Sequence, residues 1–368
     1  MKKILFVANV TKEHILKFHV PTIKKFKEEG WQVDVISAGE DNVPFCDNQI
    51  NAKWQRSPFS FKTIIGIKQL RQILDENYYD VVYCHTPVGG FVGRISGSKA
   101  RKRGTKVVYF AHGFHFCKEA SLLNWVFYPI EKHLAKKTDA LFVINDDDYD
   151  ITKKKFNHEM ALCKFPGIGV NFSRLIIANK KAVREKYRNE LKIGENDIVL
   201  IYVAELLKNK NQGYLLNVLK QLSDGVNTYR LILVGPDHSN GLFVKMSKKL
   251  GLEDKVIFTG WRNDIGELMV ASDIYVASSI REGFGINLIE AMYCGLPVVA
   301  VNNRGHRAVI KNGENGFLVS LKDSTEMVDC ISKIVKDDSL RKRISNIDVS
   351  NYDCRIVAEK IYEKISSL

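Results

Sequence analysis

The chain has 368 residues, of which 45% are hydrophobic, and carries a formal net charge of +13, so it has enough apolar material for two sizeable cores. Its seven cysteines are scattered, odd in number and without a C-x-x-C pair, so they suggest neither a disulfide framework nor a zinc site and fit a reduced cytosol best. No apolar stretch approaches the roughly 18 residues of a spanning helix, so a cytoplasmic protein, soluble or peripheral to the membrane, is expected.

In the first half of the chain, short apolar runs alternate with helical patterns. The N-terminal run is too short for a signal peptide and lacks a small-residue cleavage site, so we interpret it as a buried strand. Continuous Val, Ile and Leu runs are typical of parallel strands covered by helices on both faces. Strands are predicted at residues 4–8, 32–37, 81–84, 106–110 and 140–144.

The second half repeats this alternation, so the sequence predicts two doubly wound, Rossmann-like α/β domains. The strands are expected at residues 198–203, 231–234, 256–258, 274–277 and 298–301. Residues 165–170 are turn-rich, and we place the first domain at 1–175, the second at 176–352, and a last helix at about 353–368. Because such sheets bind ligands beyond the carboxyl ends of their strands, two facing domains would form one cleft.

Glu282 and Glu290 make the most informative segment, because glycines separate them and a helical pattern follows a predicted strand. Glycine lets the backbone approach a ligand closely, and the first amides of a helix can donate to a diphosphate. Carboxylates only accept hydrogen bonds, so one in the loop and one a turn into the helix suit a hexose and a ribose. The alternative is a glutamate at a helix N-terminus and another on a solvated face.

This segment, with the residues up to 299, resembles the E-x7-E signature of retaining glycosyltransferases of family 4, which have the two-domain GT-B fold. The likeness extends over nearly the whole chain and is strongest to bacterial enzymes that build capsular or exopolysaccharide repeat units. The other matching motifs lie at residues 109–116, 131–135, 209–211, 259–264 and 315–319.

The resemblance implies a role for each matching residue. Glu282 would contact the donor hexose, Glu290 the ribose, and His112, which follows a predicted strand, the reacting sugar. Lys210 would neutralise the diphosphate, and the last helix would pack on the first domain. The expected catalytic residues are His112 and Glu282, and the expected donor-binding residues are Lys210, Arg262, Gly283, Phe284, Gly285, Ile286, Asn287 and Glu290. No metal or other cofactor is expected.

Two positions depart from the family pattern. Many relatives carry an arginine where this chain has Glu205, and that arginine would pair with the diphosphate, which a carboxylate cannot do. Relatives also often have a glutamate at the position of Ala308. Lys210 is therefore the main candidate cation, with Arg262 or Arg281 as a helper.

The resemblance implies a retaining transfer of a hexose from a nucleotide diphosphate donor, with a UDP-sugar expected, in surface polysaccharide synthesis. The acceptor would be a saccharide or a lipid-linked sugar, for example one carried by undecaprenyl diphosphate. Loops expected at residues 10–20, 42–58 and 236–242 would govern selectivity. A sugar-nucleotide epimerase is the alternative, whereas a dehydrogenase is disfavoured because neither half contains the G-x-G-x-x-G turn.

Most of the positive charge falls in the first 178 residues. Residues 99–106 form a dense basic cluster, and residues 122–128 place aromatic and aliphatic side chains before a second basic group at 132–137. This combination is typical of contact with an anionic membrane, and the alternative is a buried helix that ends in solvated lysines. Basic clusters also occur in nucleic-acid-binding proteins, but the recognition patterns of such proteins are missing, so no nucleic-acid partner is expected.

The acidic run at residues 145–150 has two interpretations. Its aspartates have the spacing of the D-x-D sites that hold Mg²⁺ or Mn²⁺ in the other large glycosyltransferase fold. They also precede three lysines in a helical pattern, and acidic residues stabilise a helix N-terminus. We favour the second interpretation.

Overall fold

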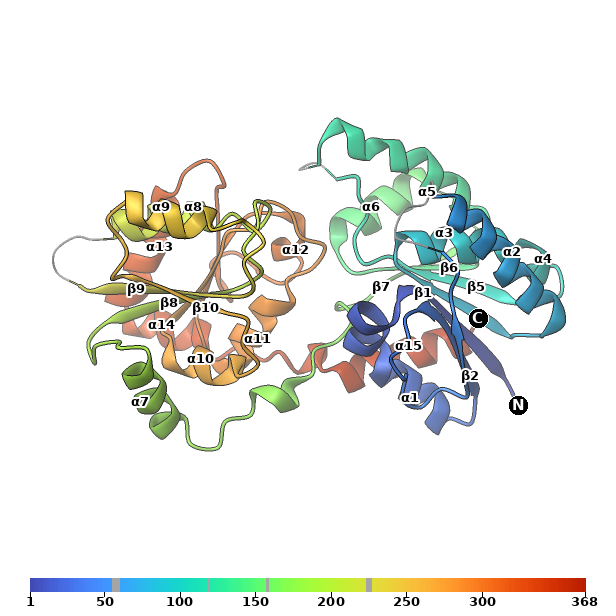
Figure 1. Cartoon of the computed structure of the whole chain (residues 1–368), viewed down its shortest axis with the longest axis horizontal. Coiled ribbons are helices and arrows are strands. Elements are labelled where there is room, and N and C mark those ends of the chain that lie inside the picture. Colours follow the sequence, from blue (N-terminus) through green and yellow to red (C-terminus); the bar gives the residue numbers. More distant parts are fainter. Residues whose placement is uncertain (55–59, 118–119, 157–158, 223–226) are drawn as a thin grey trace. The chain divides into compact units, whose positions relative to one another are not determined.

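The computed structural model describes residues 1–54, 60–117, 120–156, 159–222 and 227–368. They form two compact units: unit 1 comprises Met1–Gly169 and Ser350–Leu368, and unit 2 comprises Val170–Val349. Each unit is built on a parallel sheet with helices on its two faces, as the sequence predicts (Figure 1).

The described residues of unit 1 form a seven-stranded sheet in the order β3-β2-β1-β4-β5-β6-β7. The strands are β1 Lys3–Val10, β2 Gln32–Ala38, β3 Asn48–Asn51, β4 Val81–His85, β5 Lys106–Phe110, β6 Ala140–Val143 and β7 Ala161–Lys164. The helices are η1 Thr11–His19, α1 Val20–Glu28, α2 Phe61–Glu76, α3 Pro87–Ser96, α4 Ser98–Arg101, η2 Leu122–Val126, α5 Phe127–Ala135, α6 Asp146–Lys155, η4 Ser350–Tyr352 and α15 Cys354–Ser366.

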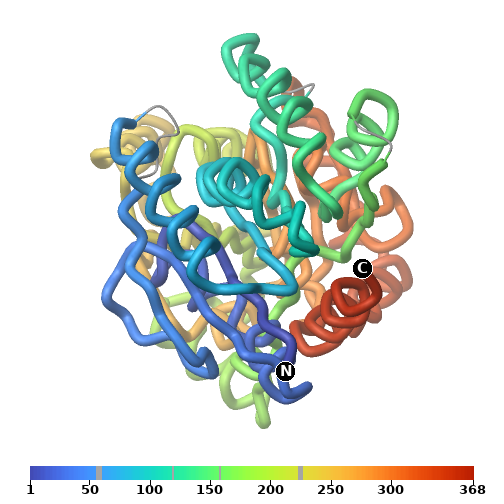
Figure 2. The backbone as a smooth tube through the Cα atoms, turned by 90° about the vertical axis from the view of Figure 1, so that its right-hand side faces the viewer, coloured from blue at the N-terminus to red at the C-terminus, as the bar shows by residue number. Residues whose placement is uncertain are grey.

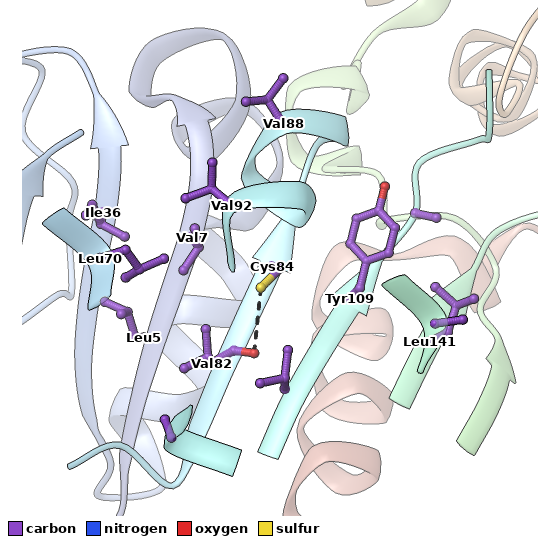
Figure 3. Packing of buried hydrophobic residues seen from close by; sticks show 14 of the residues in the cluster. Leu5, Val7, Ile36, Leu70, Val82, Cys84, Val88, Val92, Tyr109 and Leu141 are labelled. Carbon is purple, nitrogen blue, oxygen red and sulfur yellow. Dashed lines mark hydrogen bonds between the residues drawn. The ribbon is translucent and has the colours of Figure 1, made fainter. Parts of the chain in front are cut away.

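Central strands of unit 1 are buried on both faces, which explains their continuous apolar sequence. Leu5 and Val7 of β1 lie beside Val82 and Cys84 of β4 on the face that α2 and α3 cover (Figure 3). The opposite face is aromatic, and Phe6 meets Tyr83 with ring centroids 5.2 Å apart. Strand β3 has no buried side chain and β7 is partly exposed, so neither shows the apolar run that predicts a strand.

The prediction of a loop at residues 10–20 is wrong, because Thr11–His19 forms a π-helix, η1. Its buried residues Thr11, Ile15 and His19 recur every four positions, and Pro21 follows in the first turn of α1. Proline has no N–H to donate to an α-helical hydrogen bond. In the expected loop at 42–58, residues 48–51 form β3, and residues 55–58 lie outside the described part. Residues 236–241 precede the helix that begins at Leu242 and belong to no helix or strand.

Helix α15 packs on α1 within unit 1. Lys25 Nζ lies 2.6 Å from a carboxylate oxygen of Glu359, and Phe26 meets Tyr362 edge to face with centroids 5.2 Å apart. Figure 2 shows this last helix, in red, beside the N-terminal part of the chain. The chain therefore returns to unit 1 after it has completed unit 2.

The six strands described in unit 2 are all parallel, in the order β10-β9-β8-β11-β12-β13. The strands are β8 Ile198–Val203, β9 Tyr229–Val234, β10 Val256–Gly260, β11 Ile274–Ala277, β12 Val298–Val301 and β13 Phe317–Val319. The helices are η3 Phe172–Leu175, α7 Lys180–Glu190, α8 Gln212–Gln221, α9 Leu242–Lys249, α10 Ile265–Ala271, α11 Ile286–Cys294, α12 Arg304–Arg307, α13 Thr325–Lys336 and α14 Asp338–Ser345.

The chain passes from unit 1 to unit 2 between Gly169 and Val170, before the boundary expected between residues 175 and 176. Residues 172–175 contact α11 of unit 2, and Phe172 stacks on Tyr293 with ring centroids 4.2 Å apart. The chain returns to unit 1 between Val349 and Ser350, before residue 352, where the second domain is expected to end. Among the residues that the structure describes, no helix combines the length and apolar character needed to cross a membrane.

Candidate active site

Glu282 lies in the loop between β11 and α11, where four polar side chains converge. Lys210 Nζ donates to Glu282 Oε1 at 2.5 Å, and the hydroxyl of Ser279 donates to the same oxygen at 2.6 Å. Ser279 also meets the buried Tyr202 hydroxyl at 2.6 Å. Burial, the largest effect, raises the pKa of Tyr202, so this phenol stays protonated. The carboxylate of Glu282 therefore accepts hydrogen bonds from the ammonium group of Lys210 and from the hydroxyl of Ser279, which in turn contacts the hydroxyl of Tyr202.

Hydrogen bonds to backbone carbonyls fix the Lys210 loop against the Glu282 loop. The backbone N–H of Ile280 donates to the carbonyl of Asn209 at 2.8 Å, and the side-chain amide of Asn209 donates to the carbonyl of Arg281 at 3.0 Å. Ser278 donates its hydroxyl to the carbonyl of Lys210 at 2.8 Å. Because these loops follow neighbouring strands β8 and β11, the carboxyl edge of the sheet brings together residues 72 positions apart.

Gly305 allows the Glu282 loop to approach helix α12. A Cβ at this position would lie 2.6 Å from Cβ of Glu282 and 2.8 Å from the amide nitrogen of Phe284. Both distances are shorter than side chains tolerate. An alanine at 305 would therefore displace the loop that carries Glu282, Gly283 and Phe284.

Glu290 lies four residues after the first residue of α11, as expected, and is buried, with 4% of its surface exposed. Its carboxylate is paired with the guanidinium of Arg174, whose side chain is 55% exposed. A buried carboxylate needs such a partner, because an unpaired charge in the interior is costly. The sequence offered no signal for Arg174, which lies 116 positions away in the segment that we had assigned to the first domain.

The N-terminus of α11 and the loop before it contain five of the expected donor-binding residues. Gly285 precedes the helix as its N-cap, and Ile286 and Asn287 are its first two residues, where amides have no partner within the helix. The side chain of Asn287 donates to the carbonyl of Val203 at 3.3 Å, which ties the helix to the end of β8. Gly283 and Phe284 precede Gly285 in the loop.

Arg262 does not join this cluster. Its Nε donates to Asp264 at 2.7 Å, its second terminal nitrogen also binds Asp264, and Glu190 lies 3.5 Å away. The hydrogen bonds from Arg262, the first cause, lower the pKa of Asp264 to about 2. Arg262 thus has local anionic partners, which leaves Lys210 as the cation in contact with Glu282.

Glu205, which departs from the pattern that the resemblance implies, is exposed, and its backbone carbonyl accepts from the side chain of Gln212 at 2.9 Å. The sequence analysis missed one residue that interacts electrostatically with Glu282: His306 is completely buried, and its Nδ1 is 2.6 Å from the carbonyl of Val301. Burial lowers the pKa of His306, although Glu282 opposes the shift. In the sequence, the signal that could have identified His306 is its position directly after Gly305.

His112, expected to be catalytic, lies in unit 1, two residues after β5. Its Nε2 is 3.5 Å from Nδ1 of His85, the last residue of β4. His14 and His19, both on η1, complete a group of four histidines. The aspartate run takes the structure that we favoured: Asn145 caps α6 by accepting from the N–H of Asp148 at 2.8 Å, and Asp146–Asp148 form the first turn.

Two family comparisons cover most of the chain. Residues 3–145 match the family described as glycosyl transferase 4-like, and residues 183–348 match the family described as glycosyl transferases group 1. EpsD of Bacillus subtilis (strain 168), named as a glycosyltransferase, is 40% identical over 347 residues, which cover 93% of this chain and 90% of that protein. The chain is a member of the group 1 glycosyltransferases.

This glycosyltransferase is also similar to the UDP-Gal:alpha-D-GlcNAc-diphosphoundecaprenol alpha-1,3-galactosyltransferase of Escherichia coli. The two are 28% identical over 286 residues, which cover 76% of this chain and 72% of that protein. The crystal structure of Anabaena HepE in complex with UDP and glucose matches with a TM-score of 0.81 over 100% of both chains, at 23% identity. The glycosyltransferase therefore has the expected GT-B fold. These likenesses give no support to an epimerase or a nucleic-acid-binding protein.

Proposed function

We propose that this glycosyltransferase transfers a hexose, with retention of anomeric configuration, from a UDP-sugar to a saccharide or an undecaprenyl-diphosphate-linked acceptor in surface polysaccharide synthesis. The observation that carries the proposal is the contact of Lys210 with Glu282 at the carboxyl edge of the unit 2 sheet, beside the N-terminus of α11. A cation, helix amides and a hydroxyl-binding carboxylate are what a sugar diphosphate requires. The name of the E. coli relative, which contains both UDP-Gal and diphosphoundecaprenol, supports this donor and acceptor class.

In the proposed complex, Lys210 and the amides of Ile286 and Asn287 bind the diphosphate, together with the backbone of Gly283, Phe284 and Gly285. Glu282 accepts from the hexose hydroxyls, and Glu290 accepts from the ribose. Breaking the bond between the anomeric carbon and the phosphate oxygen leaves an oxocarbenium-like sugar and a nucleoside diphosphate with growing negative charge. Preorganised donors that face this charge lower the barrier without the need for a metal.

The acceptor hydroxyl attacks the anomeric carbon on the face that the diphosphate leaves. Its proton passes to an oxygen of the departing diphosphate, so the step needs no side-chain base. His112 contacts the reacting sugar in this proposal. Its neutral state suits a hydrogen-bonding role, because burial lowers its pKa well below the usual value of histidine.

We also propose that the protein binds the inner face of the membrane through an exposed apolar segment of unit 1. Leu122 is 89% exposed, Leu123 84% and Val126 55% on helix η2, which has no buried residue. The exposed Lys132 and Lys136 follow on and after α5. Apolar side chains that enter the headgroup region next to cations bind anionic lipid, and each nearby cation contributes about 1 kcal/mol. Such attachment would bring the enzyme to a lipid-linked acceptor.

Two measurements on the purified protein test the donor and the reaction. Thermal stability is measured with UDP-, GDP- and dTDP-sugars; at about 100 times the Kd a ligand stabilises by about 2.7 kcal/mol, which raises the melting temperature by several degrees. Radiolabelled donor is then incubated with undecaprenyl-diphosphate-linked sugars. Label that enters the lipid fraction supports transfer, whereas label that stays in an isomerised sugar nucleotide contradicts it and supports an epimerase.

A further inference from the structure

Four histidines from three parts of the sequence converge in unit 1. One ring nitrogen from each of His14, His19, His85 and His112 lies within 4.8 Å of the corresponding nitrogens of the others. The Nε2 atoms of His14 and His19 are 3.0 Å apart, and Nε2 of His112 is 3.5 Å from Nδ1 of His85. In tetrahedral zinc sites, metal–nitrogen distances of about 2.0–2.1 Å place the ligand nitrogens roughly 3.3–3.4 Å apart. The two short contacts lie near this value, whereas other separations in the cluster reach up to 4.8 Å and the rings of His19 and His85 have centroids 3.8 Å apart, so the side chains have to adjust to surround an ion.

The fold brings the four side chains together at the carboxyl edge of three neighbouring strands. Strand β4 lies between β1 and β5; η1 begins directly after β1, His85 ends β4, and His112 follows β5. His14 and His19 are five residues apart. On an α-helix such residues point in different directions, whereas the wider turn of the π-helix, with its i to i+5 repeat, aligns them. The rare geometry of η1 is what allows both rings to face His85 and His112.

The chemistry of the cluster fits a transition metal better than a proton. Burial, the largest effect in each case, lowers the pKa of His14 to about 4 and that of His19, His85 and His112 well below the usual value. The rings are therefore neutral at physiological pH, which is the form of histidine that binds metals. His85 approaches His112 through Nδ1, and its other ring nitrogen, Nε2, is buried without a hydrogen-bond partner among the described residues.

We propose that His14, His19, His85 and His112 form a binding site for one divalent transition-metal ion of the zinc class. Imidazole ligands favour Zn²⁺, Cu²⁺, Ni²⁺ and Co²⁺ over Mg²⁺ or Ca²⁺, which prefer oxygen. His19 and His85 are fully buried, whereas His14 and His112 are partly exposed. Because His112 is also proposed to contact the reacting sugar, an ion bound by its ring would compete with that contact; the metal-binding test itself does not depend on the proposed function.

The test is zinc binding to the untagged, full-length protein after chelator treatment, measured by titration calorimetry. We expect one Zn²⁺ per chain. His14→Gln and His112→Gln, at the partly exposed positions, should each weaken binding at least as much as the roughly 10–100-fold loss seen when outer-shell partners of metal sites are removed. His115→Gln is the matched control, because His115 lies three residues from His112, is exposed and is outside the cluster. Circular dichroism verifies that each variant is folded.

Cobalt provides an independent readout that needs no variant. Co²⁺ bound by four nitrogens in a tetrahedral site gives visible absorption bands that hexa-aqua Co²⁺ lacks, and Zn²⁺ should displace it. The proposal is overturned if the folded wild-type protein binds no Zn²⁺, or if the His14→Gln and His112→Gln variants bind it as tightly as His115→Gln. Should both variants fail to fold, the Co²⁺ spectrum of the wild-type protein decides: tetrahedral bands support the site and their absence overturns it.

Discussion

Lys210 Nζ and Glu282 Oε1 are 2.5 Å apart and form an ion pair. Both are the expected ligands of a single molecule, Lys210 for its diphosphate and Glu282 for its sugar. The pair keeps each side chain in place before a ligand arrives, since the lysine stem and the carboxylate are both largely buried. In the proposed complex, donor binding exchanges this contact for two new ones, so we expect the affinity for the nucleotide to depend on how readily the pair separates.

Replacing Lys210 with alanine should lower the affinity for UDP roughly 10–100-fold. A hydrogen bond to a charged group contributes about 1.5–3 kcal/mol, which corresponds to this range. Lys208→Ala is the control, because Lys208 is an exposed lysine of the same loop. Titration calorimetry with UDP measures both variants. An equal loss in the two would mean that general positive charge, rather than contact from Lys210, attracts the diphosphate.

Glu290→Ala should remove most of the preference for an intact ribose. Wild-type protein should bind UDP more tightly than 2′,3′-dideoxy-UDP, because we propose that the buried carboxylate accepts from the ribose hydroxyls. The variant should bind the two ligands about equally. Comparing the ratios cancels general damage to the site, including the loss of the contact with Arg174. A ratio that is unchanged from the wild type would place the ribose elsewhere.

Replacing both Leu122 and Leu123 with serine should weaken sedimentation with anionic vesicles at low salt. Each leucine that enters the apolar layer contributes on the order of 1.5–3 kcal/mol, so the double variant should lose well over tenfold in binding. Ile176→Ser is the control, because Ile176 is 66% exposed and belongs to unit 2. Vesicles of neutral lipid should bind the wild type less. Wild-type protein that stays in the supernatant with anionic vesicles would rule out this attachment.

The ion pair between Arg94 and Glu131 should be important for the stability of unit 1. Arg94 is 1% exposed, donates to both carboxylate oxygens of Glu131 at 2.8 and 3.0 Å, and stacks 3.9 Å above the ring of Tyr109. Glu131→Ala leaves a buried, unpaired guanidinium and should cost about 3–5 kcal/mol of unfolding free energy in urea. The double variant Arg94→Met, Glu131→Leu should cost less than Glu131→Ala. The reverse order would mean that the charge pair itself is indispensable.

Acid should destabilise unit 1 through its histidines. Burial lowers the folded-state pKa of His14 to about 4, whereas the unfolded chain binds this proton near the usual 6.5. The unfolded state therefore holds more protons between pH 6.5 and pH 4, so stability is full above pH 6.5 and falls as the pH drops through this window. Each such group contributes a slope of about 1.36 kcal/mol per pH unit. In metal-free buffer, melting temperatures of His14→Gln should depend less steeply on pH than those of His115→Gln.

The sequence predicted the strands that are buried on both faces and the local setting of Glu282 and Glu290, because each depends on residues close together in the chain. It did not predict β3, β7 or β13, which have few buried side chains. The partners of the two glutamates were harder still. Arg174 reaches Glu290 through a segment without regular periodicity, and His14 meets His112 only because β1, β4 and β5 are neighbours in the sheet. Contacts between residues far apart in the chain depend on the tertiary arrangement, such as the strand order, which local sequence patterns do not encode.

The return of α15 to unit 1 has a consequence for synthesis on the ribosome. Unit 2 is continuous from Val170 to Val349, so all its residues can emerge and fold together. The earlier unit has to wait, with the apolar surface around Phe26 uncovered, until Cys354–Ser366 has been translated. N-terminal domains usually fold first during synthesis, whereas here unit 1 can complete its fold only after all of unit 2 has been translated.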